Sequence, residues 1–268
     1  MAKPSKFVTA LMGILQTHSQ VSVEFACAEI GFSEATCRRL FGQLEKEGLV
    51  ERFWGGVKLP NQNLIHQTSV YERQTTNLEA KMVIAQKAAE MVQDHEVIIL
   101  DGGTTTAQMV PFLAERKIKV ITNSILIAQA FDQLRPKSNG PEILVTGGWL
   151  FQELGVLTGP ETRETLRKYH AGKLFLSPAG LDENYLTNHH PDIVETEQTM
   201  IQQSDQLIVL ADSSKIGLKN MCRIASTDEA DIILLNSSKE AIEFQSKLKH
   251  PSIIRLIQAQ APWPPKGE

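Results

Sequence analysis

Short apolar runs between residues 97 and 210 of the chain predict the strands of a parallel sheet. In order, they are Val97–Leu100, Val120–Ile121, Ile143–Val145 and Leu207–Leu210. Runs rich in β-branched residues suit strands that are buried on both faces, as in parallel sheets covered by helices. Helical patterns alternate with these runs as far as about Ile257. This alternation predicts an α/β domain.

Small polar residues follow each of these runs. They are Asp101-Gly102-Gly103-Thr104-Thr105-Thr106, Thr122-Asn123-Ser124, Thr146-Gly147-Gly148 and Asp212-Ser213-Ser214-Lys215. In parallel sheets, ligands bind beyond the carboxyl ends of the strands. Backbone N–H groups, hydroxyls and the start of a following helix together favour an anion. The strand ends therefore predict a site for a small phosphorylated molecule. For the first turn taken alone, an ordinary strand-to-helix turn capped by threonines is an equally good interpretation.

The first sixty residues contain three helical patterns followed by a ribbon. The first pattern covers residues 5–18, and Ser22 is placed to cap a second helix over Val23–Ile30. Ser33 begins a third helix, whose apolar stripe consists of Cys37, Leu40, Phe41 and Leu44. Residues 49–59 form a two-stranded pattern around Gly55-Gly56. This order of elements predicts a winged helix-turn-helix.

A winged helix-turn-helix domain places the second helix of its helix-turn-helix motif in the major groove of DNA. The residues of this chain that suit contacts to bases or phosphates are Ser33, Thr36, Arg38 and Arg39 on that helix, with Arg52, Trp54 and Lys58 on the wing. The alternative is a packing module with a solvated basic patch. Residues 1–60 hold seven basic and six acidic side chains, a balance that favours this alternative somewhat.

Changes in composition along the chain predict its division into domains. We predict a DNA-binding domain at 1–59, a polar linker at 60–75, an effector-binding domain at 76–258 and a tail at 259–268.

The sequence also excludes several classes of protein. No apolar stretch approaches the roughly 20 residues needed to span a bilayer, so we expect a cytoplasmic protein. Three scattered cysteines and seven histidines show neither disulfide nor metal-ligand spacing. No cofactor motif is present, because the Gly-rich turn lacks Walker A and Rossmann spacing.

Several blocks of the chain together resemble the DeoR family of bacterial transcriptional regulators. The blocks are Ser33 to Phe41, Gly55-Gly56, Leu100 to Thr106, Thr122 to Ser124, Gly147-Gly148, Ala179 to Asp182 and Ala211 to Lys215. The resemblance covers about residues 5–236. It implies an effector domain related in fold to sugar-phosphate isomerases. It also implies a repressor of a sugar catabolic operon, controlled by a phosphorylated sugar.

The resemblance also implies which residues surround the effector. These are Asp101, Gly102, Gly103, Thr104, Thr105, Thr106, Asn123, Ser124, Gly147, Gly148, Asp182 and Lys215. Threonine hydroxyls, N–H groups and Lys215 suit the phosphate, while Asp101 and Asp182 suit sugar hydroxyls. Glu195 is a further candidate, although a solvated acid is at least as good an interpretation.

The chain departs from the family pattern at three places. Leu40 stands where the family has an acidic residue, and Trp54 stands where a wing histidine is common. A basic residue is usual around Glu197-Gln198, where this chain has none.

Two other functions stay open at this point. One is a sugar-phosphate isomerase, for which Asp101 or Asp182 would supply a catalytic carboxylate. The other is a phosphosugar-binding partner that does not bind DNA. For the regulator, we expect operator DNA and a sugar phosphate as partners and a homodimer or homotetramer as the assembly.

Overall fold

A computed structural model describes residues 8, 10, 11, 13–15, 20–46, 49–53, 55–58, 70–134, 136 and 140–258. The chain forms two compact units, Met1–Gln67 and Thr68–Glu268. Each unit has a hydrophobic core of its own.

The first unit is the predicted winged helix-turn-helix. Its helices α2 (Val23–Ile30) and α3 (Glu34–Lys46) follow helical residues at 8, 10, 11 and 13–15 and precede the strands β2 (Glu51–Phe53) and β3 (Gly56–Lys58). A strand that the sequence did not predict, β1 (Gln20–Ser22), pairs with β3. Ser22 caps α2 by accepting a hydrogen bond of 3.1 Å from the Phe25 N–H. The buried side chains of Phe41 and Leu44 from α3 pack in the core, as their spacing predicts.

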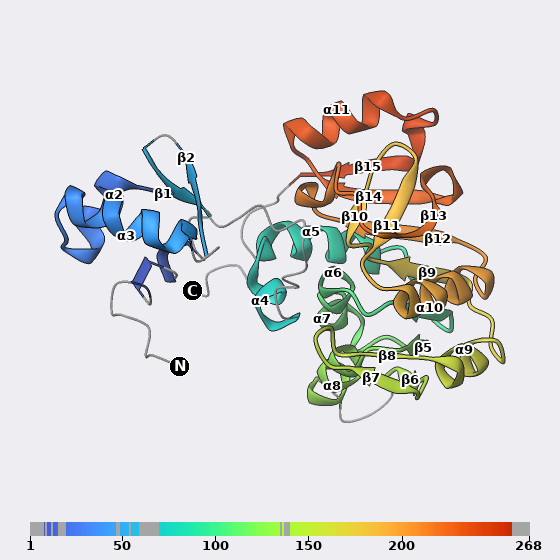
Figure 1. The fold of residues 1–268 in the computed structure, drawn as a ribbon. Helices are drawn as coiled ribbons and strands as arrows, with labels where there is room; N and C mark the ends of the chain where they lie inside the picture. The colour runs from blue at the N-terminus through green and yellow to red at the C-terminus, as the bar shows by residue number, and fades with distance from the viewer. Residues whose placement is uncertain are drawn as a thin grey trace, which may run out of the picture. The chain divides into compact units, whose positions relative to one another are not determined.

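The second unit contains a seven-stranded, fully parallel sheet (Figure 1). The strands, in chain order, are β4 (Val97–Leu100), β5 (Lys119–Thr122), β6 (Glu142–Val145), β9 (Lys173–Leu176), β12 (Leu207–Ala211), β14 (Ile232–Asn236) and β15 (Ile254–Ile257). Their order across the sheet is β15-β14-β12-β9-β4-β5-β6. The four runs singled out in the sequence are therefore strands of one parallel sheet.

Alternate side chains of these strands enter two separate cores, one on each face of the sheet. Ile98 and Leu100 pack with α5 (Leu78–Ala89), α7 (Val110–Leu113) and α8 (Ile125–Gln133). Ile99 packs on the opposite face, in the core that also holds residues of α9 (Pro160–Leu166), α10 (Pro191–Gln202) and α11 (Lys239–Lys247). Burial on both faces explains why the runs are continuously apolar.

Smaller elements lie around this sheet (Figure 1). The hairpin of β7 (Trp149–Phe151) and β8 (Val156–Thr158) is antiparallel, as is the sheet of β10 (Gly180–Leu181), β11 (Tyr185–Asn188) and β13 (Cys222–Ser226). Short helices are α6 (Thr104–Ala107), η1 (Ser213–Lys215), η2 (Thr227–Glu229) and η3 (Pro251–Ile253).

The stretch 60–75, predicted as a linker, ends in a helix. This helix, α4 (Val70–Thr75), belongs to the second unit. Val70 is buried, and its N–H donates a hydrogen bond of 3.1 Å to the Glu153 carbonyl. A helix of six residues is too short to show an apolar period in the sequence, which explains why the pattern did not predict it. The predicted tail, 259–268, lies outside the described residues.

Candidate functional site

The candidate site lies where the strand order of the sheet changes direction. From β4 the chain adds β5 and β6 on one side and then β9, β12, β14 and β15 on the other. Asp101 follows β4 and Ser177 follows β9, its neighbour in the sheet. The Ser177 N–H donates a hydrogen bond of 3.2 Å to Oδ2 of Asp101. In open α/β sheets such a switch point is where ligands bind.

A small cavity opens beside this pair of residues. Its lining consists of Arg73, Asp101, Gly102, Gly103, Asn123, Leu154, Val156, Ser177, Ala179, Asn188, Ile193 and Glu197. Four of these, Asp101, Gly102, Gly103 and Asn123, are among the predicted effector residues. The cavity has a volume of about 30 Å³, which is room for about one water molecule.

The Gly-Gly turn allows the chain to pass close to the neighbouring loops. A Cβ on Gly102 would meet Cγ1 of Val156 at 2.1 Å, and a Cβ on Gly103 would meet Cβ of Ser177 at 2.2 Å. Neither approach leaves room for a side chain. The turn therefore needs glycine for close packing at the cavity wall.

Two buried acids share this cavity. Burial raises the pKa of Asp101 to about 6, although N–H groups of Ser177 and Gly102 and the charge of Arg73 oppose the shift. Burial, with the nearby charge of Asp101, raises the pKa of Glu197 well above its ordinary value. Asn188 donates a hydrogen bond of 2.7 Å from Nδ2 to Oε1 of Glu197. The two carboxyl groups therefore hold a proton more tightly than exposed acids do.

Three cations lie near the same strand ends. Arg73 comes from α4, Lys81 from α5 and Lys215 from η1 after β12. Burial, together with the charges of Lys215 and Arg73, lowers the pKa of Lys81 to about 8, although the charge of Asp212 opposes the shift. Burial likewise lowers the pKa of Lys215, and the charge of Arg73 adds to this effect. The acids whose charges act on these cations are Asp212, for the two lysines, and Asp101, for Arg73.

Asp212 is itself engaged with neighbours. Its Oδ1 accepts hydrogen bonds from Nδ2 of Asn77 at 3.0 Å, from the Ser214 N–H at 3.1 Å and from the Ser214 hydroxyl. This carboxylate fixes the η1 turn that carries Lys215.

Three buried polar atoms of the cavity lining have no hydrogen-bond partner among the described residues. They are Nε of Arg73, Oδ1 of Asn123 and Oε2 of Glu197. Nearly all buried polar groups in proteins are paired, so an unpaired set in one cavity indicates a ligand or ordered water. These unpaired atoms include one donor, on Arg73, and two acceptors, on Asn123 and Glu197.

Other predicted effector residues have structural roles at the edge of this site. The Thr106 hydroxyl contacts the carbonyl oxygens of Asp101 and Gly103, each at 2.7 Å, and Thr104 and Thr105 are buried beside it. Ser124 caps α8 by accepting a bond from the Ile127 N–H. None of these four residues belongs to the cavity lining among the described residues.

Gly147 and Gly148 do not line this cavity either. Both adopt positive φ in the exposed loop after β6, and the Thr162 hydroxyl donates a bond of 2.6 Å to the Gly147 carbonyl. They connect that loop to α9.

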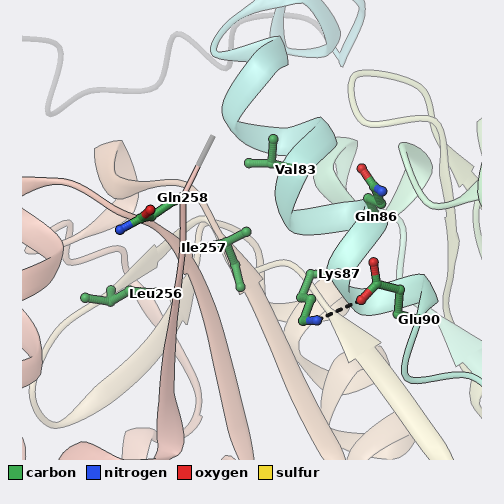
Figure 2. Close-up of a pocket in the computed structure, with 7 residues that line it drawn as sticks. All are labelled: Val83, Gln86, Lys87, Glu90, Leu256, Ile257 and Gln258. Carbon is green, nitrogen blue, oxygen red and sulfur yellow. Dashed lines mark hydrogen bonds and ion pairs between the residues drawn. The ribbon is translucent and has the colours of Figure 1, made fainter. Parts of the chain in front are cut away.

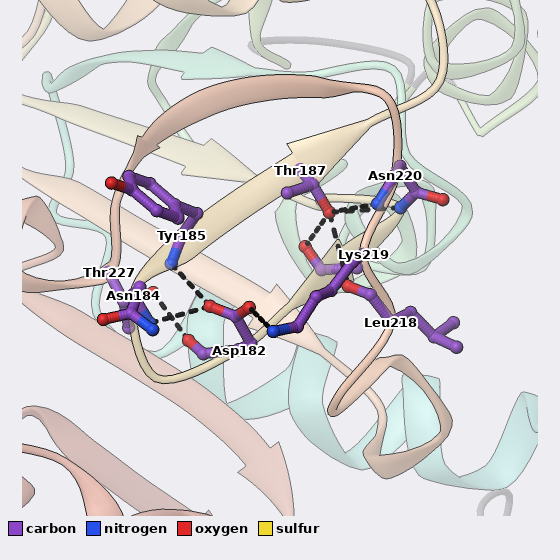
Figure 3. A network of polar contacts seen from close by, with 9 residues as sticks. Asp182, Asn184, Tyr185, Thr187, Leu218, Lys219, Asn220 and Thr227 are labelled. Carbon is purple, nitrogen blue, oxygen red and sulfur yellow. Dashed lines mark hydrogen bonds and ion pairs between the residues drawn. The ribbon is translucent and has the colours of Figure 1, made fainter.

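Asp182 lies in a separate polar network at the β10–β11 turn (Figure 3). Its Oδ1 accepts bonds from the N–H groups of Asn184 and Tyr185, at 2.7 and 2.8 Å, and its Oδ2 is 3.1 Å from Nζ of Lys219. Burial alone would raise the pKa of Asp182, but these partners lower it overall. The carboxylate holds the turn, and the structure does not bring it to the cavity. Glu195 is also outside the lining, in an ion pair of 2.9 Å with Arg163.

A second hollow, of about 210 Å³, lies between α5 and the end of β15 (Figure 2). Its charged groups, Lys87 and Glu90, are paired with each other at 2.7 Å and are about half exposed. Its chemistry is that of a solvated surface groove, without the buried, unpaired groups of the cavity beside Asp101.

The predicted DNA-contacting residues that the structure describes lie at the surface of the first unit. Ser33, Arg38, Arg39 and Arg52 are exposed and Thr36 is half-buried. Arg38 is in an exposed ion pair with Glu34 at 3.3 Å, one turn earlier on α3. Trp54 lies outside the described residues, as does the side chain of Lys58.

The sequence analysis missed Arg73, Ser177, Asn188 and Glu197. Ser177 follows strand β9 just as Asp101 follows β4, so the strand-end rule applied to every strand would have found it. Arg73 had no such signal, because it lies within the stretch interpreted as a linker. Glu197 was singled out only as a departure from a family pattern.

Within the described ranges, no helix is long and apolar enough to span a membrane. The same residues contain no group of three or more His, Cys, Asp or Glu side chains that could hold a metal ion.

Comparisons with known proteins agree with the description of both units of the chain. Residues 9–63 match the DeoR-like helix-turn-helix domain, and residues 76–237 match the DeoR C terminal sensor domain. The chain is 33% identical to the HTH-type transcriptional repressor GlcR of Bacillus subtilis, over 85% of this chain and 86% of GlcR. It is 31% identical to the HTH-type transcriptional regulator GlpR of Haloferax volcanii, over 82% and 85% of the two chains.

A solved ribose 5-phosphate isomerase A from Methanocaldococcus jannaschii is 19% identical, with a TM-score of 0.39 over 53% of this chain and 55% of that one. The relatives identified by sequence are regulators, which supports the regulator over the enzyme. The chain belongs to the DeoR family of transcriptional regulators.

Proposed function

We propose that this DeoR-family regulator represses a sugar catabolic operon, and that a phosphorylated sugar bound beside Asp101 controls its binding to DNA. The observation that carries the sugar-phosphate site is the arrangement of charge at the switch point. Buried acids and unpaired acceptors line the cavity together with the cation Arg73, and the charge of Arg73 acts on Lys81 and Lys215, which lie outside that lining.

The cationic end suits the phosphate. The charge of Arg73 lowers the pKa of both Lys81 and Lys215, and the charge of Lys215 also lowers that of Lys81, so a dianion among them relieves like-charge repulsion. Each charge-assisted hydrogen bond to phosphate also adds specificity for the phosphorylated sugar. The acidic end suits the polar groups of the sugar, because Asp101, Asn123 and Glu197 offer oxygen acceptors there.

The exposed face of α3 suits operator DNA. We assign contacts to bases or phosphates to Ser33, Thr36, Arg38 and Arg39, and contacts to the phosphate backbone to Arg52, Trp54 and Lys58. The repressor GlcR supports repression as the sign of regulation. A homodimer or homotetramer in the cytoplasm, with domain boundaries near residues 59 and 76, completes the proposal.

The test measures how the same protein binds a phosphorylated sugar and operator DNA. Thermal unfolding is followed with a panel of phosphorylated and unphosphorylated hexoses, hexuloses, pentoses and amino sugars, and operator binding is followed with the upstream DNA of neighbouring sugar genes. A ligand at 100 times its Kd stabilises by about 2.7 kcal/mol. The ligand that stabilises must also change operator affinity, and DNA must change ligand affinity by the same factor.

Two results contradict the proposal. One is a protein that no phosphorylated sugar stabilises. The other is an operator affinity that stays the same with every phosphorylated sugar that binds.

A further inference from the structure

The acidic end of the cavity presents acceptors that the protein leaves free. Asn188 occupies Oε1 of Glu197, and Oε2 has no partner among the residues that the structure describes. Asn123 is oriented by a bond of 3.1 Å from its Nδ2 to the Leu157 carbonyl, which leaves Oδ1 without a described partner. Both side chains are 1% exposed, so bulk water does not compensate them.

Asp101 adds a carboxylate to these two oxygens. It accepts one N–H from Ser177 at 3.2 Å, and the turn that carries it lies against Asn123. A Cβ on Gly102 would lie 3.5 Å from Oδ1 of Asn123. Three side chains from β4, β5 and α10 thus direct acceptors to one small volume.

The charge of the lining is unbalanced. Its ionisable groups are Arg73, Asp101 and Glu197, so two ionised acids face one guanidinium. A buried carboxylate without compensation is costly. Without a ligand, the acid pair lowers its negative charge by keeping a proton, as its raised pKa values indicate. A ligand group that carries positive charge compensates the negative charge while both acids stay ionised.

We propose that this end of the cavity binds a primary ammonium group on the sugar, so that the effector is an amino-sugar phosphate. The inference rests on the proposed function, since it names the ligand of the same site. An ammonium group has three N–H donors, one each for Asp101, Asn123 and Glu197. A hydroxyl at the same carbon offers one donor and no charge, and N-acetylation removes the charge.

Proton release gives a second signature of this binding. When the ammonium group replaces the proton that the acid pair keeps without a ligand, that proton leaves to the solvent. The neutral hydroxyl analogue has no charge with which to replace it.

The test compares matched ligands on the full chain. The probes are 2-amino-2-deoxy hexose 6-phosphates of the gluco, galacto and manno series, their parent hexose 6-phosphates and their N-acetyl forms. Calorimetric titration in two buffers of different ionisation enthalpy gives both Kd and protons released. We expect an amino form to bind about 10- to 100-fold more tightly than its parent and its N-acetyl form.

Glu197→Gln keeps the size of the side chain and removes its charge. We expect it to abolish most of the preference for the amino form over the parent sugar phosphate and to reduce proton release. Glu195→Gln is the control, since Glu195 is on the same helix, half exposed and outside the cavity. Thermal unfolding shows that each variant is folded. If Glu197→Gln does not fold, the ligand preference and proton release of the unsubstituted protein decide.

The outcomes separate this inference from the proposed function. Tighter binding of any phosphorylated sugar that lacks an amino group, or an amino preference that survives in Glu197→Gln, overturns the inference alone. Absence of binding by every phosphorylated sugar overturns it together with the proposed function.

Discussion

Lys81 on α5 donates a hydrogen bond from Nζ to the main-chain carbonyl of Arg73 on α4. Lys81 is 3% exposed, an unusual position for a lysine. The bond fixes the backbone of the residue whose guanidinium lines the cavity. The two residues therefore tie α4 to the rest of the effector domain.

Replacement of Lys81 gives a pH-dependent change in stability. The pKa of Lys81 is lowered to about 8 in the folded chain from 10.5. Between about pH 8 and pH 10.5, the unfolded state binds more protons than the folded state, so this group makes stability rise with pH. Lys81→Met should lose this rise and weaken phosphosugar binding, as followed by denaturant unfolding at several pH values and by ligand titration. Lys87→Met, at an exposed position of the same helix, is the control. An unchanged pH profile would argue against the buried, proton-releasing lysine.

The acid pair predicts an opposite trend at lower pH. The pKa of Asp101 is raised to about 6 in the folded chain from 3.8. Between about pH 4 and pH 6, the folded state binds more protons, so this group makes stability fall as pH rises. Asp101→Asn should flatten that part of the stability profile, measured by chemical unfolding without ligand. Because Asp101 and Glu197 interact, the profile reports the pair and not one residue. A variant that retains the full slope would place the titrating group elsewhere.

Lys215 is expected to recognise the phosphate. Loss of a charge-assisted hydrogen bond costs binding about 10- to 100-fold, so Lys215→Ala should weaken binding of the phosphorylated sugar by that factor. The unphosphorylated sugar should lose little. Lys219→Ala is the matched control, because Lys219 is exposed and pairs with Asp182, outside the cavity. Equal losses for both sugars would assign Lys215 to the shape of the site and not to the phosphate.

The arginines of α3 are expected to contact the operator. Arg38→Ala and Arg39→Ala should each cost about 1–3 kcal/mol of operator binding where they contact bases, measured by titration of labelled DNA. A phosphate contact should instead weaken all DNA sequences alike and reduce the salt dependence. Arg38 must exchange its exposed partner Glu34 for DNA, which costs little in water. A double variant with unchanged affinity would exclude α3 as the recognition helix.

The strands and both helices of the helix-turn-helix were predictable because they follow simple periods. Four apolar runs became β4, β5, β6 and β12, and Ser22 and Ser33 lie at the starts of α2 and α3. The polar turns after the strands pointed to Asp101 and Asn123, which line one cavity because parallel strands bring their carboxyl ends to one edge.

The rest of the site depends on contacts that leave no local pattern. Arg73 reaches the cavity from a helix of six residues, and Glu197 reaches it from α10, far along the chain. Asp182 is expected beside the sugar, and in the structure its carboxylate closes a turn by accepting hydrogen bonds from the N–H groups of Asn184 and Tyr185. A sequence shows that a carboxylate follows a strand, but not whether neighbouring N–H groups already occupy it.

The packing of α4 within the second unit also sets how much chain connects the two units. Arg73 is the first cavity residue after the boundary at Gln67 between the two units, and α4 begins only at Val70. Release of residues 70–77 from the second unit would lengthen the connection between the units by roughly 25 Å when extended. In the homodimer proposed above, a longer connection would change the effective concentration of one DNA-binding unit at the half-site beside its partner. A ligand that holds Arg73, as proposed, would then act on reach, and the affinity of each single half-site would stay the same while that of the paired operator changes.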